Sequence, residues 1–152
     1  MVERLTPDIC IIGAGSGGLS VAATAAGFGV STVLVEQGKM GGDCLNAGCI
    51  PSKALIEAAR AAHSMARARQ FGIFVRGTEI DFHKVNQHVH DVITAIAPND
   101  SKERYRGLGV RVIEGKARFT DPETVMVGDE ISIKARRYVI AAGSSPALPD
   151  IP

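Results

Sequence analysis

The sequence predicts an α/β domain built around a parallel β-sheet, and three observations point to this fold. The first is an apolar run over residues 8–12, which has no polar face and suits a strand covered on both sides. The second is a glycine-rich turn at 13–18, followed by a helix of small residues over 19–26. The third is a second apolar run over 31–36, which ends in an acidic residue. Strand, turn, helix and strand in this order predict a βαβ unit.

The glycine-rich turn has the spacing of a dinucleotide-binding fingerprint. Gly13 suits the tight turn, Gly15 leaves room for a pyrophosphate, and Gly18 lets the helix pack closely on the strand. Free N–H groups at the start of the helix would bind the phosphates. Glu36 follows at about 20 residues and is placed to accept the ribose hydroxyl groups. The sequence therefore predicts a dinucleotide site where these strands end.

Later segments extend this sheet and add further short strands. Helices are expected over 52–70 and over about 82–106, and Pro98 should kink or restart the second one. Short strands separated by turn residues are expected from about 110 to 133, and we interpret them as a β-meander. A final apolar run over 138–142 should return to the main sheet.

Two of the three cysteines, Cys44 and Cys49, lie in a glycine-rich loop shortly after the βαβ unit. In a regular helix this spacing would separate their Cα atoms by about 7.5 Å along the axis, whereas disulfides favour about 5.5 Å. The glycines in and around the loop would let the backbone bend enough to close the bond. A disulfide held in such a loop tends to be strained and reducible. We interpret the pair as a redox switch and not as a structural staple.

Bulk composition argues against several classes of function. The chain of 152 residues suffices for one domain with a core, and its net charge of +1 gives no sign of a nucleic-acid surface. No signal peptide or membrane-spanning run is predicted, so we expect a cytoplasmic protein with no membrane partner. In that compartment a close cysteine pair is more often catalytic or metal-binding, and Cys10 should be a buried side chain. The four histidines lack companions at ligand spacing, so no metal site is expected.

Residues 41–53, GGDCLNAGCIPSK, resemble the active-site signature of the pyridine nucleotide-disulphide oxidoreductases, the family of dihydrolipoamide dehydrogenase, mercuric reductase and glutathione reductase. The glycine turn and residues 140–146 are similar too, so the resemblance covers nearly the whole chain. Ser52 favours the lipoamide and mercuric branches. The resemblance implies a Rossmann-like FAD/NAD(P)-binding domain with three layers, two of β-strands and one of α-helices, of which only the first half is present. Residues 1–145 would form this partial FAD-binding domain, and 146–152 would start the linker to an absent NAD(P)H-binding domain.

The resemblance also implies a role for each residue of the site. Cys44 would be the interchange thiol that reacts with the substrate, and Cys49 the charge-transfer thiolate beside the flavin. Lys53 would hold positive charge beside the flavin nitrogen that accepts hydride. The implied FAD-binding residues are Gly13, Gly15, Ser16, Gly17, Glu36, Gln37, Gly41, Gly42, Asp43, Lys53, Ala117, Ala142 and Gly143. Asp43 and Ala142 depart from the commonest family pattern, which has threonine at both positions.

As a function, the resemblance implies electron transfer between NAD(P)H, FAD, the Cys44–Cys49 pair and a disulfide or dithiol substrate such as a lipoyl group. The parent protein would be a homodimer, and the chain alone is expected to be inactive. Two alternatives stay open: reduction of Hg(II), as in mercuric reductase, and a stand-alone thiol-relay or binding module without a nicotinamide partner. A small metal-binding domain that uses the two cysteines is disfavoured because further ligands are lacking.

Overall fold

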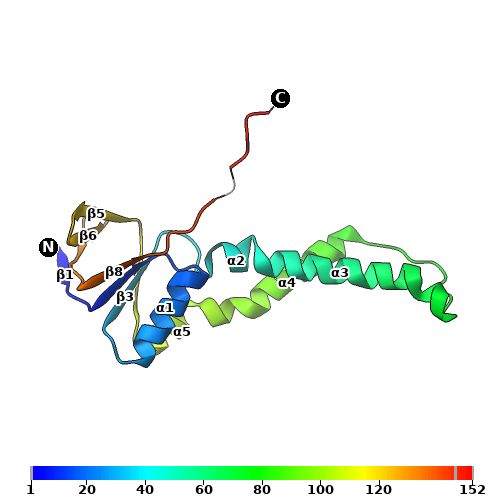
Figure 1. Cartoon of the computed structure of the whole chain (residues 1–152), viewed down its shortest axis with the longest axis horizontal. Coiled ribbons are helices and arrows are strands. Elements are labelled where there is room, and N and C mark those ends of the chain that lie inside the picture. Colours follow the sequence, from blue (N-terminus) through cyan, green and yellow to red (C-terminus); the bar gives the residue numbers. More distant parts are fainter. Residues whose placement is uncertain (1, 146, 152) are drawn as a thin grey trace.

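The computed structural model describes residues 2–145 and 147–151, which form an α/β body with a pair of helices projecting from it (Figure 1). The strands are β1 (Glu3–Leu5), β2 (Ile9–Ile12), β3 (Thr32–Glu36), β4 (Arg111–Glu114), β5 (Ala117–Asp121), β6 (Thr124–Val127), β7 (Ile131–Ile133) and β8 (Arg137–Ile140). The helices are α1 (Ser16–Gly27), α2 (Gly42–Asn46), α3 (Cys49–Arg67), α4 (Phe82–Ile96) and α5 (Lys102–Gly107), with 3-10 turns η1 (Ala68–Phe71) and η2 (Ala97–Asp100). Pro146 and Pro152 of the predicted linker lie outside the described residues.

A parallel sheet of order β4-β3-β2-β8 forms the centre of the body, as the sequence predicted. One face packs against α1 and α5 through a core cluster that includes Ile11, Leu19 and Tyr105. The other face packs against a second sheet through a cluster that includes Val33 and Ile133. Because successive strand residues face opposite sides, the continuously apolar strands β2 and β3 supply both clusters. Helices, parallel sheet and second sheet make three layers, which confirms the predicted α/β Rossmann-like fold.

The second sheet begins later in the chain than the sequence predicted. The expected β-meander over about 110–133 is wrong at its start, because β4 pairs in parallel with β3 in the central sheet. The antiparallel meander consists of β5, β6 and β7, and β1, which was not predicted, adds a parallel strand beside β7. The error has a physical cause: β4 buries Val112 in one core cluster and Ile113 in the other. A short strand buried on both faces has no alternation that assigns it to a sheet.

The helices differ from the predictions mainly at their ends. The predicted 52–70 helix begins at Cys49, and the preceding loop contains the short helix α2. Pro51 is the third residue of α3, where its missing N–H removes no helical hydrogen bond. The predicted break at Pro98 is confirmed: the chain turns through η2, and α5 restarts with Ser101 as its cap, whose Oγ accepts a hydrogen bond from Arg104 N at 3.2 Å.

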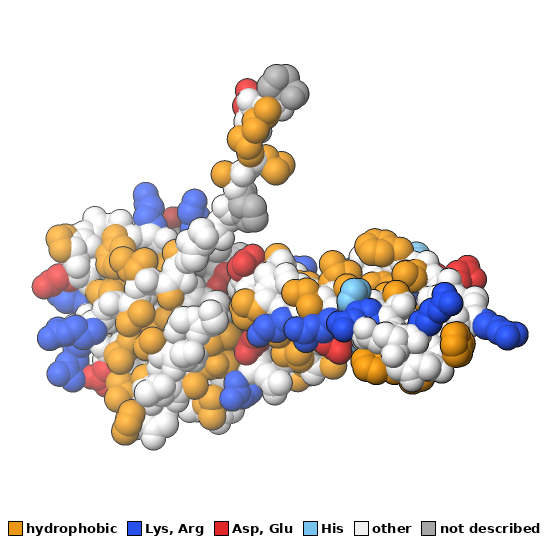
Figure 2. All heavy atoms as spheres, turned by 45° about the vertical axis from the view of Figure 1, so that its right-hand side comes forward, with side chains coloured by type: hydrophobic (Ala, Val, Ile, Leu, Met, Phe, Trp, Pro, Cys, Tyr) orange, Lys and Arg blue, Asp and Glu red, His pale blue; other side chains and the backbone are white. Residues whose placement is uncertain are grey.

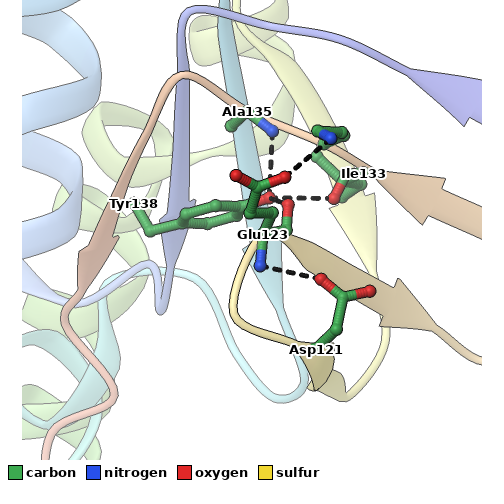
Figure 3. A network of polar contacts seen from close by, with 6 residues as sticks. Asp121, Glu123, Ile133, Ala135 and Tyr138 are labelled. Carbon is green, nitrogen blue, oxygen red and sulfur yellow. Dashed lines mark hydrogen bonds and ion pairs between the residues drawn. The ribbon is translucent and has the colours of Figure 1, made fainter.

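A cluster of hydrogen bonds joins β8 to the meander (Figure 3). The hydroxyl of Tyr138 lies 2.6 Å from the carbonyl oxygen of Glu123 and 3.0 Å from that of Ile133. It also accepts a hydrogen bond from the backbone N–H of Ala135 at 2.9 Å. The Glu123 N–H in turn donates to the carboxylate of Asp121 at 2.8 Å. One phenolic hydroxyl therefore ties the β5–β6 turn and the end of β7 to the central sheet.

The projecting part consists of α3 and α4, which pack side by side (Figure 1). Among the described residues, α3 buries only Ala54 and α4 only Val89. Figure 2 shows large apolar side chains exposed over this part, with basic side chains among them. The exposed large apolar side chains of this region include Leu55, Ile56 and Met65 of α3, Phe71 of η1, and Ile73 and Phe74 of the loop that leads to α4. None of the described helices has both the length and the apolar character needed to cross a membrane.

Candidate functional site

A cavity of about 490 Å³ lies where all four strands of the parallel sheet end. Its walls come from the glycine turn after β2, from residues 36–39 at the end of β3, from 115–117 after β4 and from 141–145 after β8, with the start of α2 between them. Open α/β sheets bind ligands at the carboxyl ends of their strands, so this is the position expected for a dinucleotide.

The predicted binding residues divide into two groups by their position. Those that line the cavity are Gly13, Gly15, Glu36, Gln37, Gly42, Asp43, Ala117, Ala142 and Gly143. Four others, Ser16, Gly17, Gly41 and Lys53, belong to the adjoining helices α1, α2 and α3 or their caps and are not among its lining residues. The cavity thus brings together residues that are more than one hundred positions apart in the chain, and their binding of a cofactor stays a prediction.

Glycines let three segments meet at the floor of the cavity. Gly13 has φ +104°, and a Cβ there would lie 2.2 Å from the carbonyl oxygen of Ala141. Gly42 has φ +56°, and a Cβ there would lie 2.7 Å from the Cα of Gly15. A side chain at either position would push the segments apart and would strain the backbone as well. The turn after β2, the start of α2 and the end of β8 therefore form a wall of bare backbone.

Glu36 is fixed between two segments of the site. One of its carboxylate oxygens accepts a hydrogen bond from the Ala14 N–H at 2.5 Å, and the other accepts one from the Gly38 N–H at 2.7 Å. A carboxylate has about four acceptor positions, so two backbone bonds leave capacity for the hydroxyl groups of a ribose. The predicted acid at the end of β3 thus lies in the cavity wall and also connects the glycine turn to β3.

The polar cavity residues that the sequence analysis missed are Lys39, Asn46, Lys116, Ser144 and Ser145. The Asn46 amide donates hydrogen bonds to the carbonyl oxygens of Met40, at 3.0 Å, and Gly42, at 2.8 Å, and so braces the loop before α2. Lys39 and Lys116 line the cavity and offer positive charge to an anionic ligand. The position of the two lysines could have identified them as cavity residues, because each follows the end of a parallel strand by two or three residues.

The two cysteines lie at the junction of α2 and α3. Cys44 is the third residue of α2, and Cys49 is the first residue of α3, with the chain bending at Ala47 and Gly48 between them. Both are free thiols; Cys44 is half-buried and Cys49 is exposed. They are not among the cavity-lining residues, but Gly42 and Asp43, which are, precede Cys44 directly.

The two thiols influence each other. A side-chain hydrogen bond with Cys49 is the main cause that raises the pKa of the Cys44 thiol, followed by burial and by the charge on Cys49. The positive charge of Lys53 lowers the pKa of Cys44, and the negative charge of Asp100 raises it. Lys53 lies one helical turn beyond Cys49 on the same face of α3. The structure therefore brings together the three residues predicted to be catalytic.

The other candidate groups of the sequence lie apart from this site. Cys10 is fully buried in β2, as predicted, and burial raises the pKa of its thiol from 9.0 to about 11. His63, His83, His88 and His90 are exposed on the projecting helices. Among residues 2–145 and 147–151, no three His, Cys, Asp or Glu side chains are grouped closely enough to hold a metal ion.

Comparison with known proteins points to one family. Residues 7–152 match the family model described as pyridine nucleotide-disulphide oxidoreductase. The chain is 38% identical over 148 residues to the dihydrolipoyl dehydrogenase of Chlamydia muridarum, a match that covers 95% of this chain and 32% of that protein. It is 34% identical over 149 residues to the mercuric reductase of Streptomyces lividans, covering 95% and 31%. The dihydrolipoyl dehydrogenase of Staphylococcus aureus is 34% identical over 142 residues, covering 91% and 30%. The chain thus spans about a third of the length of the curated relatives it matches.

Proposed function

The chain belongs to the pyridine nucleotide-disulphide oxidoreductase family, and from that premise we propose that it forms the FAD-binding and redox-cysteine part of a flavoprotein disulfide oxidoreductase. The family and its dihydrolipoyl dehydrogenase relatives imply FAD and NAD(P)H as cofactors. The observation that carries the proposal is the junction of α2 and α3, where two neighbouring thiols directly follow the wall of a dinucleotide cavity. Residues 1–145 would be part of the FAD-binding domain, and 146–152 would lead toward an NAD(P)H-binding domain.

The residues around the cavity fit FAD in shape and in charge. Bare backbone at Gly13, Gly15 and Gly42 accommodates a pyrophosphate, and Lys39 and Lys116 supply positive charge to it. The N–H groups at the start of α1 would add hydrogen bonds to the phosphates. The remaining acceptor positions of the Glu36 carboxylate would take the ribose hydroxyls, and the Ala117 backbone the adenine. When bound, FAD would supply the two-electron chemistry that connects a nicotinamide to thiols.

The step that belongs to this chain is thiol–disulfide exchange. With the cysteine pair oxidised, a substrate thiolate attacks Sγ of Cys44, the S–S bond breaks, and Cys49 leaves as a thiolate. The second thiol of the substrate then loses its proton and displaces Cys44 from the mixed disulfide, and Cys44 takes up a proton as a thiol. The substrate dithiol becomes a disulfide, and the cysteine pair holds the two electrons. Cys49 is the first residue of α3, and Lys53 lies one helical turn further along the same face of that helix.

We propose a lipoyl-type dithiol or disulfide as the substrate, in a cytoplasmic homodimer. Two relatives named dihydrolipoyl dehydrogenase, at 38% and 34% identity, support the choice of a lipoyl substrate. Reduction of Hg(II) is the second candidate, because a relative named mercuric reductase is 34% identical and two neighbouring thiols suit a soft metal ion. With a lipoyl substrate the cysteine pair of this chain would exchange electrons with it, whereas with Hg(II) the two thiolates would bind the metal ion.

A single-turnover experiment on the chain itself tests the cysteine chemistry. The fully reduced chain is mixed with oxidised lipoamide, and peptide mass spectrometry locates the disulfide that forms while dihydrolipoamide is quantified. We expect a Cys44–Cys49 bond and one dihydrolipoamide per chain. Cys44→Ser and Cys49→Ser should abolish the product, and Cys10→Ala, which changes only the buried thiol, should leave it unchanged. The proposal fails if the reduced chain forms no Cys44–Cys49 bond with lipoamide. Failure with lipoamide together with tight binding of one Hg(II) ion by both thiolates would favour the second candidate.

A further inference from the structure

The helix α2, which contains Cys44, is too short to be stable by itself. It has 5 residues, and isolated helices shorter than about 12 residues are marginal in water. Leu45 of this helix is buried and contributes packing against the body. The position of Cys44 therefore depends on further contacts that hold α2 in place.

The segment at the start of α2, residues 40–42, is fixed to the body and can serve as an anchor. Met40 packs against the core cluster that includes Ile11. The Gly41 N–H donates a hydrogen bond to the carbonyl oxygen of Ala14, in the glycine turn, at 2.9 Å. A contact with this anchor would therefore fix α2 relative to the central sheet.

The side chain of Asn46 makes this contact from the other end of α2. Its amide nitrogen donates hydrogen bonds to the carbonyl oxygens of Met40, at 3.0 Å, and Gly42, at 2.8 Å. An amide nitrogen has two donor hydrogens, and both are used here. Asn46 is half-buried, so its surroundings exclude part of the water that would compete for these carbonyl groups. The last residue of α2 is thus tied back to the anchor at its start.

The chain turns sharply between the two cysteines. The carbonyl oxygen of Asp43 accepts hydrogen bonds from the N–H groups of Ala47, at 2.9 Å, and Gly48, at 2.7 Å. A Cβ on Gly48 would lie only 2.7 Å from Oδ2 of Asp43, so the residues that precede the two cysteines are in close contact. The two thiols are themselves joined by a hydrogen bond. Asn46 therefore lies inside a tight turn that brings both thiols together.

We propose that Asn46 is a positioning residue that holds the reduced Cys44 within bonding reach of Cys49. A disulfide requires its two sulfur atoms about 2 Å apart and a narrow range of backbone separations. If α2 is ordered in only a fraction of the molecules, the equilibrium constant for closing the bond falls by that fraction. The two hydrogen bonds of Asn46 keep this fraction high. The inference rests on the proposed function in taking the two cysteines as the redox pair.

Redox titration of the chain in glutathione buffers tests the proposal without flavin or lipoamide. As the disulfide forms, Cys44 and Cys49 lose two electrons and two protons, and glutathione disulfide takes them up to give two glutathione molecules. Peptide mass spectrometry gives the oxidised fraction at each buffer ratio. Asn46→Ala removes both hydrogen bonds, and Asn46→Asp keeps the shape of the side chain but, as a carboxylate, donates none. Each should lower the equilibrium constant by about tenfold, which raises the reduction potential of the pair by about 30 mV.

A matched control and a second measurement separate positioning from a general loss of structure. Gln87→Ala also removes an amide that donates a hydrogen bond, to Asp91 at 2.9 Å on exposed α4, and should leave the equilibrium constant unchanged. In the reduced chain, the amides of Ala47 and Gly48 should exchange with solvent about tenfold faster in both Asn46 variants. The free energy of global unfolding should change little, because α2 is a local element.

Two outcomes would overturn the assignment. One is an equilibrium constant that stays at the wild-type value in both Asn46 variants. The other is a wild-type chain that forms no Cys44–Cys49 disulfide at any glutathione ratio, because its thiols would then not be held within reach. Failure of the proposed function is a separate result: a chain whose cysteine pair closes in glutathione and depends on Asn46, but does not react with lipoamide, keeps the Asn46 assignment and loses the proposed reaction.

Discussion

At the scale of single residues, the three cysteines show how the same side chain acquires different chemistry from its surroundings. Cys10 lies in the core cluster between the two sheets, and burial alone raises the pKa of its thiol to about 11. Cys44 lies at the junction of α2 and α3, where a hydrogen bond with Cys49, burial and nearby charges shift the pKa of its thiol. Cys10 therefore acts as a small apolar side chain, whereas the junction pair is the one proposed for redox chemistry.

The buried thiol predicts a pH dependence of stability. Because the folded-state pKa of Cys10 lies above its ordinary value of 9.0, its contribution to stability is complete below pH 9 and is lost as pH rises toward about 11. By linkage this loss amounts to about 2 kcal/mol at pH 11. Denaturant unfolding of Cys10→Val, which has similar volume and no titratable group, should show a shallower decline between pH 9 and pH 11 than the wild type. Parallel pH profiles for the two proteins would contradict this.

Spacing in the sequence predicted those site residues whose role depends on the backbone. Gly13, Gly15 and Glu36 could be placed because a tight turn, a close approach and an acid at a strand end each require a residue type at a set distance along one βαβ unit. Lys116 and Asp100 could not, because their positions depend on long-range packing of β4 on β3 and of η2 on the loop before α2. A lysine or aspartate in a surface loop carries no local signal of what it will face.

At the scale of elements, the site depends on segments that meet without side chains between them. The turn after β2 contacts the end of β8 through Gly13 and the start of α2 through Gly15 and Gly42. This contact places α2, and with it Cys44, against the cavity. A methyl group at the contact would therefore disturb both the cavity and the position of the cysteines.

Gly42→Ala is expected to destabilise the chain and to weaken flavin binding. Its φ of +56° and the 2.7 Å approach of a Cβ to the Cα of Gly15 impose strain of about 1–3 kcal/mol. A loss of 1.4 kcal/mol in binding corresponds to about tenfold lower affinity, which titration of the chain with FAD and thermal unfolding would measure. Gly27→Ala is the matched control, because a Cβ there meets nothing within 4 Å and lies in the last turn of α1. Equal unfolding temperatures for the two variants would refute the contact.

The hydrogen bonds of the Tyr138 hydroxyl hold the meander to the central sheet. Tyr138→Phe removes the hydroxyl that accepts from the Ala135 N–H but keeps the ring, which packs edge-on against Phe119 with ring centroids 5.0 Å apart. Loss of these hydrogen bonds should reduce the free energy of unfolding by about 1–3 kcal/mol. Lys134→Met, which breaks an exposed ion pair with Glu123 in the same cluster, should change it by less than about 1 kcal/mol. Chemical denaturation compares the free energy of unfolding of the two variants. A larger effect of Lys134→Met would show that the ion pair, and not the Tyr138 hydroxyl, holds the meander to the central sheet.

Element boundaries were predictable where a local signal marks them. Pro98 marked the break before α5, and the apolar runs marked β2, β3 and β8. The strand β1 had no such signal, because it has three residues, two of them charged and exposed, and it exists only by pairing with β7. The start of α3 was placed late for a related reason: Pro51 reads as a break, although proline is tolerated in the first turn of a helix.

At the scale of the whole molecule, the cysteine junction lies between two parts with unequal packing. The helices α3 and α4 project from the body (Figure 1). The body contains both core clusters, whereas the described residues of α3 and α4 include few buried side chains. Cys49 begins the projecting helix, and Cys44 follows the cavity wall of the body. Opening of the helix pair would therefore change the distance between the two thiols before the sheet itself unfolds.

Hydrogen exchange should resolve these two parts. Amides of α3 and α4 beyond their first turns should exchange by local opening, whereas those of β2 and β3 should exchange only by global unfolding. Val89→Ala, at the buried position of α4, should lower protection in the helix pair by about 1–2 kcal/mol and leave β2 and β3 nearly unchanged. Leu34→Ala, in β3 with no exposed surface, should instead lower the global stability by about 2–5 kcal/mol and reduce protection throughout.

If Val89→Ala lowered protection in β2 and β3 as much as in α4, the helix pair and the body would form one cooperative unit. A Cys44–Cys49 disulfide would span the junction between the two parts. If the parts are one cooperative unit, forming this disulfide should leave hydrogen exchange in the helix pair unchanged. If they are two units, it should slow exchange at the start of α3.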